Sequence, residues 1–415
     1  MLFKPRKLTF VFDGGAGSSS KGLRAAHIWK HHRESHTTFA VHNYMENAAH
    51  TVVLENGDEH VLQCLNSIVP LGKDAYQKTY ISPGAAFAVQ TIRREIEKYD
   101  LSPANLGIHP QALIIQDIDV GYERGTVDFE GNPKATQGSS NLNIGSTLHG
   151  CGAAVARRVL RRPEVVLAKD VDYLRPFLCN TAQEIADRLD SGQSGLQEIP
   201  QGYQLSLMSD FFPKTTSRNV SVAHALSDSL LPPSFAGPVV ANFRTFPIRV
   251  NSNKYLQRST GKICTMAEFG ELPKEDQLII YGDSGGCYPD QEELTWAGIR
   301  DYAGFTRDIT EYTSLTKLPR RVYSFSRQNL LEALRFNNTG HEMFISVNFL
   351  NYVDAAVEGA RDTGAVLTPK VKAWLKDNVF NQEHQDVWNR QGIKVSGMFL
   401  GTWKGIDDSV SLLED

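Results

Sequence analysis

The sequence predicts an α/β fold in which helices cover a central, mostly parallel β-sheet. Apolar segments of strand length recur along the 415 residues, and segments with helical periodicity separate several of them. In addition, a first strand leads through a loop of small residues into a helix, which is the usual layout of a phosphate site. We therefore expect a sheet that carries a P-loop-like phosphate site.

The first strand is expected at Lys7–Phe12, followed by the loop 13–20 and a helix from Lys21 to about Trp29. Asn56-Gly57 separates two strand-like runs and predicts a hairpin. A helix is expected from Ser82-Pro83 to about Tyr99. Further strands are expected at Ala112–Ile115, Val239–Phe243, Leu278–Tyr281, Arg321–Phe325, Met343–Leu350 and Ile393–Phe399.

The sequence contains no internal repeat and no long low-complexity linker. We expect one domain over residues 1–415, with a surface insertion around residues 252–308 that is rich in Gly, Pro and charge.

Charge and composition exclude some classes of function. A net charge of -4 and a pI near 6.3 argue against binding to DNA, which needs clustered Lys and Arg. Five widely spaced cysteines without a CxxC pair indicate free thiols. No apolar stretch approaches the roughly 20 residues that span a bilayer, and the N-terminus lacks a signal-peptide pattern. We expect a cytoplasmic protein that binds no membrane.

The segment GGAGSSSKG, Gly14–Gly22, joins the first strand to the first helix. Small residues leave backbone N–H groups free to converge on phosphate oxygens, and Lys21 adds a mobile positive charge. The segment is not a Walker A loop, since Ser20 and Gly22 stand where that motif needs Gly and Ser or Thr. The alternative is a flexible turn with a solvated lysine.

Two further segments carry candidate chemistry. In Asn47–Thr51, a neutral His50 could donate a hydrogen bond or pass a proton to an oxygen that gains charge; it could also cap a turn. Ile144–Gly152, with Ser and Thr hydroxyls and amides before a helix with four arginines, is a candidate second anion site. Two phosphate sites favour phosphoryl transfer between a triphosphate and a nucleotide.

His27, His31 and His32 have near-helical spacing, but no neighbouring cysteine or carboxylate completes a metal site. We expect these histidines to lie on the surface.

In this order and approximate spacing, the segments resemble the signatures of the adenylosuccinate synthetase family. Gly17–Leu23 resembles its GDEGKGK, Asn47–Thr51 its NAGHT, Gly145–Ala154 its GTTGxGxGPA and Glu198–Gly202 its EGxQG. Three later segments resemble its YPYVTS, FPTRV and aspartate-loop motifs: Phe212–Ser217, Phe246–Val250 and Leu315–Arg321.

The resemblance implies a two-step reaction, in which the triphosphate phosphorylates the purine O6 and the aspartate amine displaces the phosphate. It assigns catalysis to Ser18, His50 and Lys21, and the triphosphate to Gly17, Ser19, Ser20, Gly22, Thr51 and Asn351. It assigns the acceptor nucleotide to Asn47, Ser146, Thr147, Arg161, Gln201 and Thr216, and aspartate to Thr316 and Arg320. It assigns Mg²⁺ to Ser18 and to the backbone of Ala49. Asp13, at the end of the first strand, is a candidate to replace the metal ligand that the family aspartate would supply. Because Arg161 matches an arginine that enters a neighbouring subunit's site, a homodimer is also implied.

Two departures from the family pattern refine the expected substrates. Ser18 replaces the family aspartate that takes the proton from purine N1, and a hydroxyl is a poor base near neutral pH. A serine here resembles the phage-type members, the 2-aminoadenylosuccinate synthases, which act on dGMP. Asn351 replaces the carboxylate that reads the guanine of GTP, which makes ATP or dATP the expected donor.

The sequence therefore predicts a carbon–nitrogen ligase that condenses L-aspartate with dGMP, located in the host cytoplasm if the phage-type resemblance holds. One alternative is a synthetase that uses IMP. Another is an inactive nucleotide-binding sensor, since Ser18 removes the family's base.

Overall fold

The fold is known from a computed structural model. It describes residues 1–134, 144, 146–250, 253–260, 262, 264–280, 284–312 and 318–413.

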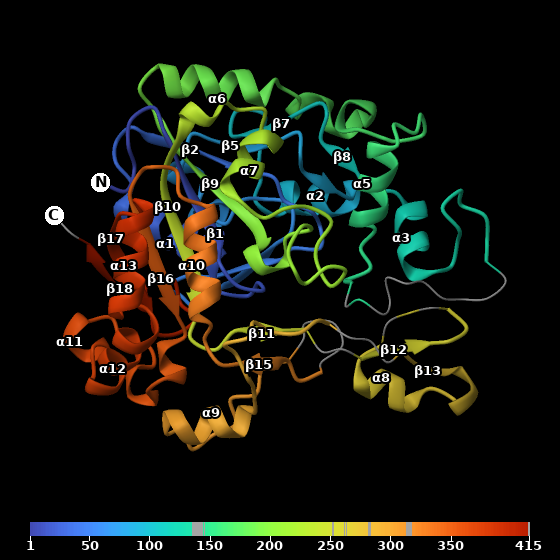
Figure 1. Cartoon of the computed structure of the whole chain (residues 1–415). Helices are drawn as coiled ribbons and strands as arrows, with labels where there is room; N and C mark the ends of the chain where they lie inside the picture. The colour runs from blue at the N-terminus through green and yellow to red at the C-terminus, as the bar shows by residue number, and fades with distance from the viewer. Residues whose placement is uncertain are drawn as a thin grey trace.

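A nine-stranded sheet forms the centre of the molecule (Figure 1). All its neighbouring pairs are parallel except the pair at one edge, where β18 runs antiparallel to β17. Its strands, in spatial order, are β18 (Ser409–Leu413), β17 (Val395–Gly401), β16 (Met343–Asn348), β10 (Ala236–Arg244), β1 (Leu8–Asp13), β9 (Ser194–Gly202), β2 (Thr37–His42), β5 (Lys78–Ile81) and β7 (Leu106–Ile108). The expected mostly parallel α/β sheet is confirmed.

Alternating side chains of β1 enter two different cores, because successive residues of a strand point to opposite faces. Leu8, Phe10 and Phe12 join one apolar cluster, and Val11 joins the other. The first cluster also contains side chains of α6 (Thr181–Asp190), α7 (Val222–Asp228), α9 (Trp296–Ala303), α10 (Arg327–Phe336), α11 (Thr363–Val366), α12 (Pro369–Asn378) and α13 (Gln382–Gln391). The second contains side chains of α1 (Lys21–His32) and α2 (Val89–Lys98). Helices thus cover both faces of the sheet.

Most expected elements are present. The first strand, the first helix, the strands β10, β16 and β17, and the Asn56-Gly57 hairpin between β3 (His50–Val53) and β4 (Glu59–Leu62) are confirmed. The helix expected from Ser82-Pro83 was placed too early, because a turn and the short strand β6 (Ala86–Phe87) precede α2.

Three expected strands lie outside the central sheet. The two-residue strand β8 (Leu113–Ile114) pairs with β6, and β13 (Gln277–Ile280) pairs with β12 (Lys254–Gln257). The third, β15 (Arg321–Tyr323), lies between β11 (Ile248–Arg249) and β14 (Glu293–Leu294) in a small antiparallel sheet.

The expected insertion contains the hairpin β12–β13 and the helix α8 (Met266–Glu271), which lie away from the central sheet in Figure 1. The hairpin contacts the rest of the chain through Leu256 and Leu278, which pack against Leu148. Leu148 belongs to the second candidate phosphate loop, so the hairpin contacts the predicted acceptor site.

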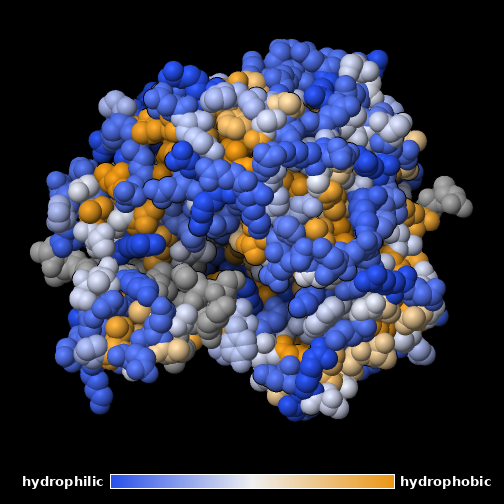
Figure 2. Space-filling view, turned by 180° about the vertical axis from the view of Figure 1, so that it is seen from behind, coloured by the Kyte–Doolittle hydropathy of each residue, from blue (hydrophilic) through white to orange (hydrophobic). Residues whose placement is uncertain are grey.

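All five cysteines are free thiols, as expected. Across the described residues, no helix combines the length and apolar character needed to span a membrane. Figure 2 shows apolar residues in small separate patches on one face of the molecule.

Candidate functional site

The loop after β1 is organised by a carboxylate of its own strand. Asp13 is fully buried, and its two oxygens accept hydrogen bonds from the amides of Gly15 (2.8 Å) and Ser19 (3.1 Å). These bonds curl the loop around the side chain. Gly202, at the end of β9, lets the neighbouring strand approach, because a Cβ there would lie 2.2 Å from the carbonyl oxygen of Gly15.

The backbone of the loop is held in an uncommon conformation. Gly17, Ser18 and Ser20 all have left-handed φ angles of 96°, 57° and 64°, which non-glycine residues adopt rarely. Two strand-end side chains hold this conformation: Arg244 donates to the carbonyl of Ser18 (3.0 Å), and Asn348 donates to that of Ser19 (2.7 Å). Ser18 remains exposed at the turn.

Lys21 and Gly22 begin helix α1 directly after the loop. The Lys21 side chain is buried, and its ammonium makes no ion pair with the residues that the structure describes. Gly22 allows close packing, since a Cβ at this position would lie 2.6 Å from Ser67 Oγ and 3.0 Å from His50 Cβ. The candidate phosphate loop and His50 are therefore packed against each other.

His50 is oriented by a buried carboxylate. Its Nδ1 contacts Glu198, which also accepts hydrogen bonds from the amide (3.2 Å) and hydroxyl (3.0 Å) of Ser67. The ring of Tyr44 lies against the imidazole, with centroids 4.2 Å apart. The other ring nitrogen, Nε2, is buried without a hydrogen-bond partner among the described residues.

The charge states of this pair follow from burial and contact. Burial lowers the pKa of His50, and the adjacent carboxylate offsets only part of that effect. Burial alone would raise the pKa of Glu198, but the contact with His50, the nearby Tyr44 hydroxyl and the hydrogen bonds from Ser67 lower it to about 2. A neutral His50 therefore donates a hydrogen bond from Nδ1–H to an ionised Glu198, and its Nε2 carries a lone pair.

Three residues expected to bind the acceptor nucleotide are brought together. Asn47 accepts a hydrogen bond from Gln201 and donates one to the hydroxyl of Thr216 (3.4 Å). Gln201 adopts a left-handed φ of 56°, and its Oε1 is buried without a partner among the described residues. Ala49 and Thr51, on either side of His50, are exposed.

The second loop differs from the expectation. Ser146 and Thr147 precede α5 (Cys151–Val159), and both are at least partly exposed. However, Glu123, at the end of α3 (Asp117–Arg124), accepts hydrogen bonds from the amides of Gly150, Gly152 and Ala153. The amides at this helix start are thus engaged by the protein itself, which leaves mainly the hydroxyls of the loop for a ligand.

Helix α5 and the turn after it carry four arginines, and three of them are bonded to other residues of the protein. Arg157 forms a buried ion pair with Asp119 (2.8 Å), Arg158 donates to the carbonyl of Pro83, and Arg162 pairs with Glu130. Arg161 is exposed, has a left-handed φ of 55°, and makes no side-chain bond to any residue that the structure describes. The resemblance implies that this arginine reaches into the site of a neighbouring subunit.

The remaining predicted residues are bonded to other parts of the protein or lie outside the described residues. Arg320 donates to the carbonyl of Tyr312 (3.2 Å), and burial lowers its pKa. Asn351 is fully buried and donates to Glu358 (3.3 Å). Thr316 and Gly145 lie outside the described residues.

The interpretation of the three histidines was wrong. His27 is buried and only His31 of the three is fully exposed. The carboxylate that the sequence appeared to lack is Asp407, which is bonded to His31 although 376 residues separate them.

Several site residues were not predicted from the sequence: Glu198, Arg244, Asn348 and the loop-organising role of Asp13. Asp13, Arg244 and Asn348 share one signal, because each is the polar last residue of a buried parallel strand. Glu198 lies in the middle of the buried strand β9. Ligands of open α/β sheets bind outside these strand ends.

No family model matches the sequence. The chain is 29% identical over 385 residues to the N6-succino-2-amino-2'-deoxyadenylate synthase of Salmonella phage PMBT28, covering 87% of this chain and 90% of that one. It is 30% identical over 248 residues to the adenylosuccinate synthetase of Pyrococcus horikoshii, covering 59% and 67%. The solved cyanophage S-2L succinoaminodeoxyadenylate synthetase, bound to dGMP and dATP, matches with a TM-score of 0.69 at 24% identity, covering 98% and 95%.

Proposed function

The chain belongs to the adenylosuccinate synthetase family, and within it we propose that the protein is a carbon–nitrogen ligase acting on dGMP. It would join L-aspartate to C6 of dGMP through a 6-phosphoryl intermediate, with ATP or dATP as phosphoryl donor. The product would be 2-amino-N6-succinyl-dAMP. The observation that carries this proposal is the exposed Ser18 at the turn of the phosphate loop, where the family has an aspartate.

The similarity to phage enzymes supports the same substrates. Phage synthases with the name N6-succino-2-amino-2'-deoxyadenylate synthase match 84% or more of this chain. The cyanophage structure holds dGMP together with dATP as an energy donor. A short, neutral Ser18 leaves room beside the base for a 2-amino group and can form a hydrogen bond with it.

His50 would act at the purine O6 during phosphorylation. Its Nε2 is the nitrogen that Glu198 does not engage, and the carboxylate stabilises the imidazolium that exists when Nε2 carries a proton. The neutral ring would first take up at Nε2 the proton that purine N1 loses when O6 is phosphorylated, and the protonated Nε2 would then donate a hydrogen bond to the oxygen. Lys21 and the loop amides would hold the γ-phosphate.

Mg²⁺ would be held by oxygen atoms, which this ion prefers. Ser18 and the carbonyl of Ala49 are on exposed residues of the two adjacent loops, and the Asp13 carboxylate has acceptor positions beyond the two that Gly15 and Ser19 use. When bound, the ion would neutralise charge on the transferred phosphoryl group.

The acceptor's 5'-phosphate would contact Asn47, Ser146, Thr147 and Thr216, with Gln201 beside them. The exposed Arg161 would complete this site in the other subunit of a homodimer. Arg320 and Thr316 would bind the carboxylates of aspartate, for which a guanidinium is suited.

Competition assays with dGMP and IMP, and with ATP, dATP and GTP, test the proposal. We expect a preference for dGMP and for an adenine triphosphate, measured by mass spectrometry of the succinyl products. Ser18→Asp should shift the preference toward IMP by roughly 5- to 150-fold, the value of one polar contact to a base edge. A wild-type preference for IMP would instead establish a conventional synthetase, and the absence of any product with either base would favour a nucleotide sensor.

A further inference from the structure

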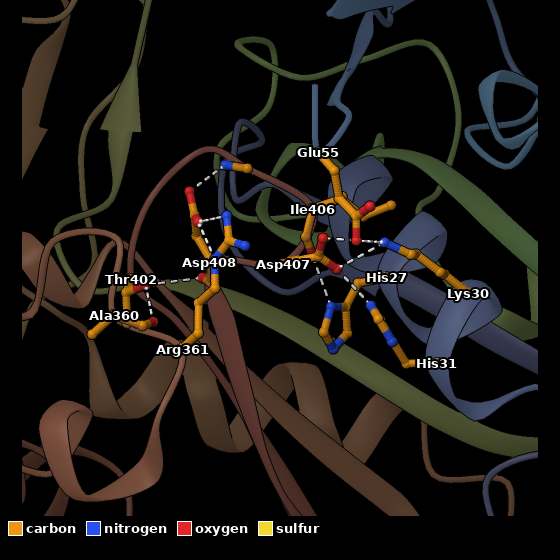
Figure 3. Close-up of polar contacts among 11 residues, drawn as sticks. His27, Lys30, His31, Glu55, Ala360, Arg361, Thr402, Ile406, Asp407 and Asp408 are labelled. Atoms are coloured by element: carbon orange, nitrogen blue, oxygen red, sulfur yellow. Dashed lines mark hydrogen bonds and ion pairs between the residues drawn. The ribbon is translucent and has the colours of Figure 1, made fainter. Parts of the chain in front are cut away.

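Two histidines of helix α1 and one aspartate of a distant loop form a cluster outside the candidate active site (Figure 3). His27 and His31 are four residues apart, so they lie on the same side of the helix. The loop 402–408, which joins β17 to β18, brings Asp407 to them. One ring nitrogen of each histidine and one oxygen of Asp407 all lie within 4.8 Å of one another.

His27 has a free lone pair in a buried position. Its Nδ1 lies 2.7 Å from the carbonyl oxygen of Ile406, and since a carbonyl only accepts, Nδ1 must carry the proton. Nε2 therefore carries the lone pair, and it is buried without a hydrogen-bond partner among the described residues. Burial lowers the pKa of His27 to about 2, so the ring stays neutral. Histidines that bind metals show this arrangement, with the other ring N–H on a backbone carbonyl.

Of the other two groups, His31 is exposed and Asp407 is a partly buried residue of a loop. The Nε2 of His31 lies 2.6 Å from Asp407. Lys30 also contacts both oxygens of Asp407, at 3.2 and 3.1 Å, but it has a second anionic partner in Glu55. A cation that replaced the ammonium at Asp407 would leave Lys30 paired with Glu55.

We propose that His27, His31 and Asp407 bind one divalent transition-metal ion of the zinc class, with water completing the coordination. Two imidazoles and a carboxylate match Zn²⁺, Co²⁺ or Ni²⁺ and discriminate against Mg²⁺, which prefers oxygen ligands. Ligand distances of about 2.0 to 2.2 Å require the groups to move closer together. The exposed His31 and the loop-borne Asp407 can make this movement around a fixed His27.

The ion would connect two parts of the fold that are distant in sequence. Helix α1 follows the phosphate loop directly, while Asp408, next to Asp407, faces the other way and binds Arg361 (3.1 Å). Thr402 also donates to the carbonyl of Ala360 (2.8 Å). Binding of the ion would thus fix the loop 402–408 between α1 and residues 360–361. It would also stabilise the folded chain, because the unfolded chain lacks the site.

Metal titration of the full chain without a histidine tag and without nucleotide tests this proposal separately from the ligase activity. The protein is freed of metal, kept in excess Mg²⁺, and titrated with Zn²⁺ by calorimetry and with Co²⁺ by visible absorption. We expect one ion per chain and a melting temperature higher by roughly 2 to 4 °C at saturation. The absence of stoichiometric binding would overturn the proposal.

Variants at His31 and Asp407 localise the ion. His31→Gln and Asp407→Asn should each weaken binding by about 10-fold or more, while His341→Gln, at a histidine outside the cluster, should leave it unchanged. Lys30→Gln should tighten binding by roughly 5-fold, because it removes a competing cation. Circular dichroism verifies that each variant is folded. Equal affinity in wild type, His31→Gln and Asp407→Asn would place the ion elsewhere and contradict the assignment.

Discussion

The two loops that the sequence predicts as phosphate sites are built differently. In each, a buried carboxylate of the protein accepts hydrogen bonds from loop amides. Asp13 binds the amides of Gly15 and Ser19 from inside the first loop, so the loop curls and its exposed turn carries Ser18. Glu123 instead binds the amides of Gly150, Gly152 and Ala153 at the helix start itself. Hydrogen bonds from amides to a carboxylate thus bend the first loop, whereas in the second they occupy the amides at the helix start that a ligand would need.

This difference assigns unequal roles to the loops. The first is packed through Gly22 against His50 and Glu198, so the position of the loop and that of His50 are coupled. The second contacts the insertion through Leu148 and precedes the helix that leads to Arg161. We therefore expect changes around the first loop to reduce the chemical step, and changes around the second to alter acceptor binding or stability.

The largest effect is expected at the first loop, for His50→Ala. Loss of a positioned acid or base lowers turnover by about 10² to 10⁴. Steady-state kinetics should show the loss in kcat, with His60→Ala on the adjoining strand β4 as the control. Glu198→Gln should have a smaller effect of the same kind. Wild-type kcat in His50→Ala would remove His50 from the chemistry.

Gly22→Ala and Gly152→Ala form a matched pair, because each is the second residue of the helix that follows its loop. A Cβ at residue 22 would meet Ser67 at 2.6 Å, whereas at residue 152 the nearest atom is a Glu123 oxygen at 3.2 Å. Gly22→Ala should lower kcat by about 10- to 100-fold, since small displacements of reacting groups are costly. Gly152→Ala should stay within about 3-fold. Equal kinetics for the two variants would contradict the coupling of the first loop to His50.

The sequence predicts the first loop well because its structure is local. Strand, small residues and helix follow one another directly, and β1, β10, β16 and β17 are visible as apolar runs. The central strand β9 was missed because it reads SGLQEIPQG, with Gly, Pro and polar residues in a fully buried strand. Those polar residues have partners: Gln197 bonds to Ser229, and Glu198 to His50.

Long-range partners account for most of the remaining differences. Nothing near Gly150 in the sequence shows that Glu123 will accept from its amide, and nothing near His31 shows Asp407. Asn351 has a nearer partner, Glu358, but its burial and this bond depend on how the segment after β16 folds back. A single sequence gives the order of such groups along the chain but not which of them meet.

At the second loop, Arg161→Leu tests the contribution of a neighbouring subunit. Loss of a charge-assisted hydrogen bond should raise the KM for dGMP by about 10-fold. Arg162→Leu, whose parent side chain pairs with Glu130, is the control and should change KM little. Mixing Arg161→Leu with His50→Ala should restore activity, since a hybrid dimer has one site with both residues intact. A mixture no more active than its components would favour a site built within one chain.

The smallest effect on kinetics is expected for Glu123→Gln, which directly tests whether the second loop is closed. The carboxylate accepts from three amides at 2.9, 2.8 and 3.3 Å, whereas a glutamine offers one acceptor oxygen and turns an N–H₂ group toward amides that also donate. A buried donor left without a partner costs about 1 to 3 kcal/mol, so denaturant unfolding should show a loss of that size. The KM for dGMP should change by less than about 3-fold, because the hydroxyls of Ser146 and Thr147 remain. If these amides were the phosphate site, removing the competing charge would lower the KM by about 10-fold or more, and the distinction between the two loops would be wrong.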